Sequence, residues 1–397
     1  MNAITREILR ESEIVGALEQ ICQALELTPS RHEEMKQRYH AVGAWLGESE
    51  NSLLAQLSIY PHGSVALGTT VKPRGRLEHD VDLVSRAARV TPETLPSALK
   101  KAIGDRLKEH GYYSTIIEEK RRCWRLNYAG EFHLDITPSI FNPRCPNGGE
   151  LVPDKELQRW KATNPLGYRD WFDRLAQLQP HILFAKSMAE DRAYADRADV
   201  APYPTQTPMK GVLRRTVQLS KRHRDIYFEH DMTGVAPISI VITTLLAQAY
   251  EICAKKTYGS ELQLIQDLIQ LMPGLITGPA TTGDASWTIW NPTTQGENFA
   301  EKWNNDAALP AAFFTWHAKL QRDVDNMTSI FGFDQMKKSL IESFGSRPVN
   351  QAMDAMVQSV STARAQGKLH VAPKVGLTAA ASATSTAVRA NTFYGAD

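Results

Sequence analysis

The stretch from Tyr60 to Val84, YPHGSVALGTTVKPRGRLEHDVDLV, decides how the rest of the chain is interpreted. It contains Gly63 and Ser64 just after a short apolar run, and sixteen residues past Ser64 it reaches the carboxylates Asp80 and Asp82. Successive side chains of a β-strand alternate between its two faces, so these carboxylates would project from one face, roughly 7 Å apart along the strand. Such a pair needs a neutralising partner.

The nature of that partner follows from the charges. Two carboxylates about 4 Å apart repel by roughly 4 kcal/mol at an effective dielectric near 20, so a strand that presents both to a cleft favours a cation between them. Hard oxygen ligands suit Mg²⁺, which keeps several waters and is often completed by substrate phosphates. Gly63 would let the backbone approach a phosphate, and Ser64 would add a hydroxyl and an N–H donor. The stretch therefore predicts a nucleoside triphosphate site.

Each of these features also occurs without a function. An isolated Asp-x-Asp is common on exposed strands and loops, and a single Gly-Ser pair is weaker still. A third acidic strand, FHLDI at residues 132–136, strengthens the functional interpretation because Asp135 is flanked there by apolar residues. A buried charge needs a partner, so packing alone does not account for an aspartate at this position.

The order Gly-Ser, hydrophobic-Asp-x-Asp strand, third Asp on a later strand resembles the pattern of the polymerase-β-like nucleotidyltransferase superfamily. More narrowly, Trp160 to Phe172 (WKATNPLGYRDWF) is similar to a segment of the cGAS/DncV-like nucleotidyltransferases, the CD-NTase family of bacterial anti-phage (CBASS) systems. Asn291-Pro292, followed by Glu297 to Ala300 and Trp303, is similar to a later segment of that family. The resemblance covers roughly residues 30–345.

The resemblance implies a fold and a reaction centre. The fold is α+β: a polymerase-β-like core with a mixed sheet and helices, plus a C-terminal helical lobe, in a bilobal cage. Two Mg²⁺ ions, for which Mn²⁺ can substitute, would be held by Asp80, Asp82 and Asp135, roughly 3.5 to 4 Å apart. One would grip the donor triphosphate together with Gly63 and Ser64. Asp135 would also accept the proton of the attacking hydroxyl.

The resemblance also points to two positions in the second lobe. It places Lys221, in a basic helix over residues 211–229, on the incoming triphosphate, although five Arg and Lys within eleven residues also fit a solvated face. It places Ser239, near the N-terminus of an apolar helix, on the same triphosphate, since a helix end is a natural anion site. Where the family often has an aromatic residue that stacks on a base, this chain has Ile240.

The function implied is template-independent joining of nucleoside triphosphates (ATP, with GTP, CTP and UTP as further candidates) into a cyclic di- or trinucleotide second messenger for anti-phage defence, with release of pyrophosphate. Two alternatives stay open. One is a transferase of the same superfamily that modifies RNA ends or a small molecule. The other is an inactive nucleotide-binding scaffold that acts through its tail.

Composition excludes several other classes. Lys plus Arg number 45 against 44 Asp plus Glu, a net charge of +1, which argues against obligate binding to long nucleic acid. The four cysteines show no Cys-x-x-Cys pairing, so neither a zinc site nor a disulfide framework is predicted. The sequence has no signal-like N-terminus and no apolar run near the roughly 20 residues that span a bilayer. We therefore expect a soluble, cytoplasmic protein without a membrane partner.

Apolar periodicity and Pro- or Gly-rich breaks predict four regions: N-terminal helices over 1–58 that brace the sheet, a catalytic core over 59–208, a helical lobe over 209–365 and a flexible tail over 366–397. The expected strands are 57–60, 80–85, 112–119, 122–128 and 131–137, with an irregular connection at 141–161. The expected helices are 91–110, 211–229, 238–252, 261–272, 297–326 and 334–365, with helical character at 181–200 before a Pro-rich crossing at 201–208.

The tail is dominated by Ala, Ser and Thr and has no apolar periodicity, which predicts a mobile segment. In some members of the family the C-terminus is conjugated to targets by a ubiquitin-like partner enzyme. The ending at residues 393–395 could serve such an accessory protein, and an unstructured tail without a partner is the alternative.

Overall fold

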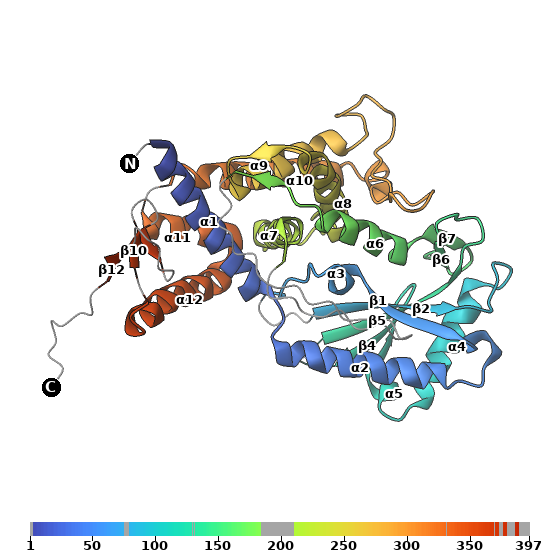
Figure 1. Cartoon of the computed structure of the whole chain (residues 1–397). Helices are drawn as coiled ribbons and strands as arrows, with labels where there is room; N and C mark the ends of the chain where they lie inside the picture. The colour runs from blue at the N-terminus through green and yellow to red at the C-terminus, as the bar shows by residue number, and fades with distance from the viewer. Residues whose placement is uncertain are drawn as a thin grey trace, which may run out of the picture.

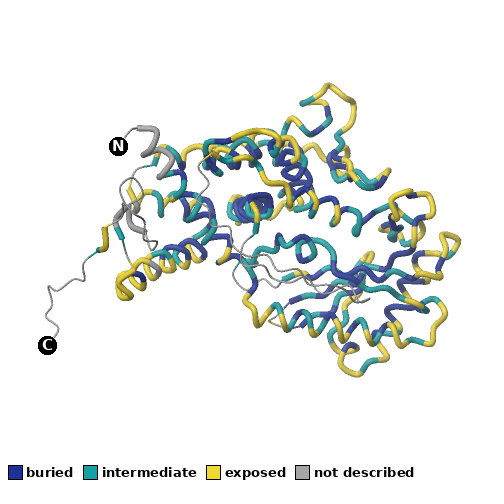
Figure 2. Tube along the Cα trace, viewed as in Figure 1, coloured by how far each residue is buried: buried dark blue, intermediate teal, exposed yellow. Residues whose placement is uncertain are grey.

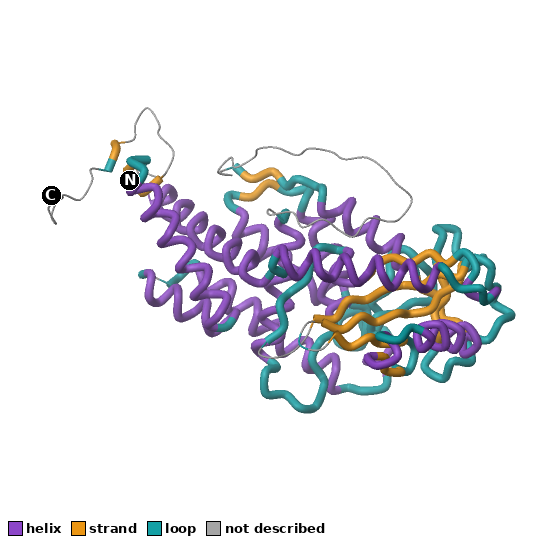
Figure 3. Tube along the Cα trace, turned by 90° about the horizontal axis from the view of Figure 1, so that it is seen from below, coloured by secondary structure: helices purple, strands orange, loops and turns teal. Residues whose placement is uncertain are grey.

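The structure is a computed structural model that describes residues 3–74, 79–128, 130, 132–183, 210–330, 332–368, 370–372, 376–378 and 386–388. Two lobes face each other, one built on a sheet and one built of helices (Figures 1 and 3). The expected helical character at 181–200, from residue 184 onward, the Pro-rich crossing at 201–208 and most of the tail lie outside the described residues.

The first lobe is a mixed sheet with helices, which confirms the expected fold class. The main strands run in the order β1 (Leu57–His62), β2 (His79–Ala87), β5 (Phe132–Phe141), β4 (Trp124–Tyr128) and β3 (Ile117–Glu119). Strands β2 and β5 are parallel, and the other pairs are antiparallel. The hairpin of β6 (Glu150–Pro153) and β7 (Trp160–Thr163) extends the end of β5.

One face of the sheet is covered by helices and the other faces the second lobe. Helices α2 (Pro29–Gly47) and α4 (Pro96–Glu109) share a core with the apolar side chains of β2 and β5, among them Val81, Leu83 and Leu134. Figure 1 shows these helices below the sheet and α3 (Gly63–Ala66) above it. Because strand residues alternate, the polar residues between the buried ones point to the opposite face, toward the helical lobe.

The helical lobe is built around α7 (Val212–Tyr227). Around it pack α8 (Ser239–Cys253), α9 (Glu261–Leu271), α10 (Ala308–Met327) and α11 (Phe333–Phe344). Figure 2 shows α7 as a buried helix in the middle of the lobe. The solvated face considered for this basic helix is absent over Thr216–His223, where every residue is buried. Its basic groups donate to carboxylates and backbone carbonyls instead of to water alone.

The two N-terminal helices do not act together. Helix α2 braces the sheet as expected, but α1 (Ala3–Leu25) packs against α7, α9 and α12 (Ser346–Ala365) of the helical lobe. Its apolar stripe, which includes Ile14, Leu18 and Ile21, belongs to the core of that lobe. The expectation that both helices brace the sheet was therefore wrong for α1. An apolar stripe predicts that a helix face is buried but does not identify the surface that covers it.

Several element bounds also differ from expectation. Helix α4 begins at Pro96, because Leu95 is extended and Pro96 fits the first helical position. Residues 113–116 form the short helix α5 (Tyr113–Ile116) before β3. The expected irregular connection at 141–161 contains β6 and the first two residues of β7. The helix expected over 334–365 is broken at Gly345, whose φ of +86° suits glycine.

The remaining short elements are η1 (Ser52–Leu54), α6 (Pro165–Ala176), β8 (His181–Ile182), β9 (Thr257–Tyr258), η2 (Met272–Leu275), η3 (Glu301–Asn304), β10 (His370–Ala372), β11 (Gly376–Thr378) and β12 (Thr386–Ala387). Within the described part of the chain, none of the helices combines the length and the apolar character that a bilayer span requires.

Candidate active site

A cavity of about 1380 Å³ is lined by residues of both lobes, and we call it the interlobe cavity. Every site residue predicted from the sequence lines it: Gly63, Ser64, Asp80, Asp82, Asp135, Lys221 and Ser239. The fold thus brings together groups that are more than 170 positions apart in the chain. Their roles in catalysis remain predictions, but their shared location is a property of the structure.

The three aspartates lie on adjacent parallel strands. In the register of β2 and β5, Asp82 stands beside Asp135, and Asp80 projects two residues earlier from the same face of β2. The side chain of Asp80 is 58% exposed and that of Asp135 is 16% exposed. The carboxylates therefore form one acidic row that runs from the cavity mouth to its floor.

Asp82 is half-buried and lies next to both other carboxylates of the row. Its pKa is raised, first by burial and then by the neighbouring charges of Asp135 and Asp80, while His62 and Arg125 oppose the rise. Among the described residues, none forms an ion pair with its carboxylate. A half-buried anion beside two like charges is an arrangement that favours a bound cation.

The structure gives a second reason for glycine at position 63, besides the expected approach of a phosphate. It follows His62, the strand partner of Asp82. Its φ is +64°, and a Cβ atom there would lie 2.7 Å from Oδ2 of Asp82. A larger residue would therefore both strain the backbone and displace a carboxylate oxygen.

Arg125 was not predicted from the sequence. Strand β4 runs antiparallel to β5 and places Arg125 beside Asp135. Its Nε and Nη2 donate to the two oxygens of Asp135 at 2.6 and 2.8 Å, and Nη2 lies 3.1 Å from Oδ1 of Asp80. The bond to Asp135 raises the pKa of Arg125 further above its usual value. Across the described residues, no three His, Cys, Asp or Glu side chains are already arranged to hold a metal ion.

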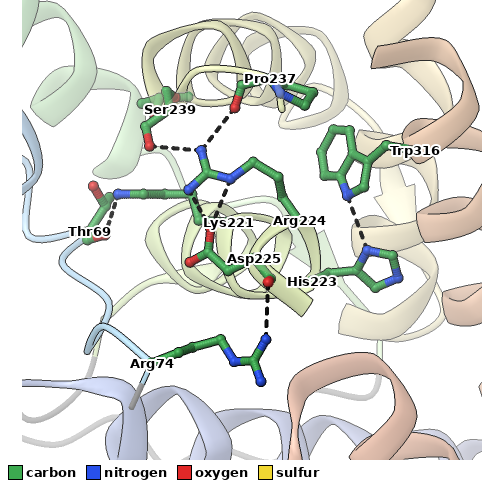
Figure 4. A network of polar contacts seen from close by, with 10 residues as sticks. Thr69, Arg74, Lys221, His223, Arg224, Asp225, Pro237, Ser239 and Trp316 are labelled. Carbon is green, nitrogen blue, oxygen red and sulfur yellow. Dashed lines mark hydrogen bonds and ion pairs between the residues drawn. The ribbon is translucent and has the colours of Figure 1, made fainter. Parts of the chain in front are cut away.

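A loop over residues 67–74 follows α3 and is held by side chains of α7. Arg214 donates through Nε to the carbonyl of Leu67 at 3.0 Å, and Gln218 donates through Nε2 to the carbonyl of Thr70 at 2.9 Å. Between them, Nζ of Lys221 donates to the carbonyl of Thr69 at 2.8 Å (Figure 4). The loop beside Ser64 is thus positioned by the opposite lobe.

Lys221 is buried, with 6% of the residue exposed. Its pKa is lowered to about 7, first by burial and then by the charge of Arg224, while Asp225 and Asp82 oppose the shift. The ammonium has one acceptor in the carbonyl of Thr69, whereas it can donate three hydrogen bonds. An anion in the interlobe cavity would stabilise its charged form.

Ser239 is the first residue of α8 and is held by Arg224. Nη1 of Arg224 donates to Oγ of Ser239 at 3.0 Å and to the carbonyl of Pro237 at 2.9 Å (Figure 4). The serine hydroxyl accepts this bond, so its own hydrogen is available to another acceptor. Ile240, at the position discussed for base stacking, also lines the interlobe cavity.

The aromatic segment at residues 160–172 serves packing, as expected for most of its members. Phe172 is fully buried, and the hydroxyl of Tyr168 lies 2.8 Å from that of Thr244 in α8. Asn164 caps α6 by accepting from the N–H of Gly167 at 2.9 Å and donates to the carbonyl of Thr293 at 3.0 Å. The segment therefore joins the sheet lobe to the helical lobe, and Asn164 and Tyr168 also line the interlobe cavity.

Comparison with known families and proteins agrees with this geometry. Residues 13–175 match the family model of the Second Messenger Oligonucleotide or Dinucleotide Synthetase domain, SMODS. The chain is 29% identical over 393 residues to a c-di-GMP synthase of Roseivirga ehrenbergii, which covers 97% of this chain and 98% of that one. It is 28% identical over 242 residues to the cyclic dinucleotide synthase CdnG of Bradyrhizobium diazoefficiens, 57% of this chain and 56% of that one.

Solved structures share the fold. The Bradyrhizobium diazoefficiens CD-NTase CdnG in complex with GTP matches with a TM-score of 0.66 at 23% identity, over 87% of this chain and all of that one. DncV of Escherichia coli, bound to 3′-deoxy GTP, matches with a TM-score of 0.53 at 17% identity, over 88% of this chain and 89% of that one. With the similarity to the full-length relative, the match to the family model supports assignment of the chain to the nucleotidyltransferases of the CD-NTase family.

Proposed function

We propose that this protein joins two nucleoside triphosphates into a cyclic dinucleotide, with GTP as a substrate. The observation that carries the proposal is the row of Asp80, Asp82 and Asp135 on β2 and β5, which faces a cavity lined by both lobes. The choice of a dinucleotide and of GTP rests on the relative named c-di-GMP synthase, which is similar over nearly the whole chain.

The acidic row fits a divalent metal. All three donors are carboxylates, which suit Mg²⁺, and Asp82 is half-buried without an ion-pair partner among the residues described. Asp80, Asp82 and Asp135 would hold two Mg²⁺ ions. When bound, the ions would supply charge neutralisation at the phosphates and a lower pKa for the attacking hydroxyl.

The chain's own groups would position the donor nucleotide. Ser64 and the backbone next to Gly63 lie on the sheet side of the cavity, and Lys221 and Ser239 lie on the helical side. Together they would hold the triphosphate from both sides, so that the α-phosphate lies beside the acidic row. Asp135 would accept the proton of a 2′- or 3′-hydroxyl as it attacks. Such a site acts through positioning and electrostatics.

The test is incubation of the purified protein with labelled GTP and Mg²⁺, alone and with the other nucleoside triphosphates. A product that resists phosphatase and is lost in the Asp82→Asn variant supports cyclisation. Mass spectrometry then gives its bases and ring size. Labelling that requires added RNA or a small-molecule acceptor would favour the other transferases of the superfamily instead.

The wider role stays part of the proposal. Anti-phage signalling, a cytoplasmic location and an accessory protein at the C-terminus are expected from the resemblance. One solved neighbour, CdnC of Escherichia coli MS115-1, is in complex with a HORMA protein, and it matches with a TM-score of 0.54 at 14% identity over 81% of this chain and 94% of that one. The scaffold alternative would require phage protection to survive Asp80→Ala with Asp82→Ala and to be lost when residues 366–397 are deleted.

A further inference from the structure

The guanidinium of Arg125 lies where a cation would meet the acidic row. We propose that Arg125 is an internal counter-ion that keeps a divalent cation from binding firmly to Asp80 and Asp135 until a nucleoside triphosphate arrives. This inference rests on the proposed function. It adds an order of events, in which metal and nucleotide are loaded together.

The first argument is occupancy. Arg125 uses both oxygens of Asp135, at 2.6 and 2.8 Å, and approaches Asp80 at 3.1 Å. A bidentate contact of this kind occupies one of the two lone pairs on each carboxylate oxygen. Mg²⁺ binds carboxylate oxygens at 2.0–2.1 Å. On the side of Asp135 that Arg125 occupies, the ion must displace the guanidinium, and on the other side it binds a carboxylate whose charge is already neutralised.

The second argument is charge. The acidic row carries three negative charges when ionised, and Arg125 cancels one of them. A divalent cation that enters without a nucleotide is therefore attracted less strongly than it would be without Arg125, and it is repelled by the positive charge of the guanidinium. A triphosphate reverses this balance because it brings several negative charges and offers phosphate oxygens, which match the guanidinium fork as well as a carboxylate does. Arg125 can then exchange Asp135 for a phosphate.

Arg122 provides the matched comparison. It also lines the interlobe cavity and carries the same charge. It is exposed, and no hydrogen bond or ion pair joins it to the acidic row within the described residues. Removing its charge tests the general potential of the cavity, whereas removing that of Arg125 tests direct competition at the carboxylates.

The experiment is a Mn²⁺ titration of the full chain, in which the free ion is followed by electron paramagnetic resonance. It is run with and without a non-hydrolysable GTP analogue. Without nucleotide, Arg125→Gln should bind Mn²⁺ on the order of tenfold more tightly than the unsubstituted protein, because a half-buried charge next to the ion is removed. Arg122→Gln should change the affinity by less than about threefold, because solvent screens an exposed charge. The analogue should enhance Mn²⁺ binding less in Arg125→Gln than in the unsubstituted protein.

Equal Mn²⁺ affinity in Arg125→Gln and the unsubstituted protein would overturn the inference, as would equal gains in the two glutamine variants. If Arg125→Gln does not fold, Arg125→Lys replaces it, since lysine keeps the charge but cannot make the bidentate contact. The Mn²⁺ affinity of Arg125→Lys should lie between that of the unsubstituted protein and the tenfold gain expected for Arg125→Gln. An unchanged Mn²⁺ affinity would again overturn the inference. Failure of the unsubstituted protein to bind Mn²⁺ even with the analogue would instead count against the proposed function.

Discussion

The buried ammonium of Lys221 should make nucleotide binding depend on pH. Because burial lowers its pKa to about 7 in the free protein, half of the Lys221 side chains are neutral at that pH. A triphosphate next to Lys221 favours the charged form and raises this pKa, so binding takes up a proton at any pH above about 7. The affinity should therefore fall as pH rises, by about tenfold for each unit above 7.

The assay measures the dissociation constant of a non-hydrolysable GTP analogue with Mg²⁺ between pH 7 and pH 9. The last ionisation of a phosphate has a pKa of about 6, so the ligand itself changes little in this range. The unsubstituted protein should lose on the order of 50-fold in affinity across the two units, from half protonated to about one per cent protonated. Calorimetry in buffers of different ionisation enthalpy reports the proton uptake directly.

Lys221→Arg is the matched variant because arginine stays charged throughout this range. It should bind with a flat pH profile, and Lys221→Met should bind weakly with a flat profile. Melting temperatures at each pH confirm that both variants are folded. If Lys221→Met keeps the pH slope of the unsubstituted protein, the reasoning is refuted, because the titrating group must then lie elsewhere.

Three further outcomes follow from the site. Gly63→Ala should abolish product formation and destabilise the fold by roughly 1–3 kcal/mol in a denaturant titration, since it combines backbone strain with displacement of Asp82. The control is Gly148→Ala, at a φ of +71° with open space around it, which should keep its activity. A comparable loss of activity in Gly148→Ala would assign the effect to backbone strain alone. Asp82→Asn should also lose activity but raise the melting temperature of the metal-free protein, because it removes a half-buried charge whose pKa is raised by burial and by like charges. A lowered melting temperature would show that the charge is well solvated. Asn164→Ala and Ser260→Ala each remove one helix cap worth about 1 kcal/mol. Asn164→Ala should lower the free energy of unfolding by more than Ser260→Ala does, because Asn164 also donates to the carbonyl of Thr293. Equal losses would mean that this second bond contributes nothing.

The acidic row could be predicted because it depends on local rules. Strand alternation puts Asp80 and Asp82 on one face whatever their neighbours are, and an aspartate between apolar residues marks Asp135 as paired. Lys221 and Ser239 came from the family resemblance, and the fold places both beside the row. Arg125 stands between buried Trp124 and Leu126, a signal of the same kind as that of Asp135. It was missed because only the register of β4 against β5 shows which carboxylate it meets.

The misplaced elements have a common cause. The apolar stripe of α1 and the basic residues of α7 each fit two environments, and the choice between them is made by distant parts of the chain. Helix α1 found a partner in α12, more than 300 positions away in the sequence. Most basic groups of α7 bond to carboxylates and carbonyls more than 40 positions away, such as Arg215 to Glu19 and Lys221 to the carbonyl of Thr69. Periodicity specifies a face, whereas long-range packing specifies its neighbour.

Side chains of α7 hold the loop over residues 67–74 through the backbone carbonyls of the loop. This determines which sequence changes the loop tolerates. Arg214, Gln218 and Lys221 all donate to backbone oxygens, which every amino acid supplies. Except at Gly68, whose φ is +65°, replacing a loop side chain therefore leaves the three acceptors where they are. Inserting a single residue before Thr69 would instead shift the carbonyls of both Thr69 and Thr70 away from Lys221 and Gln218. Length, more than composition, is thus the property that this segment must keep.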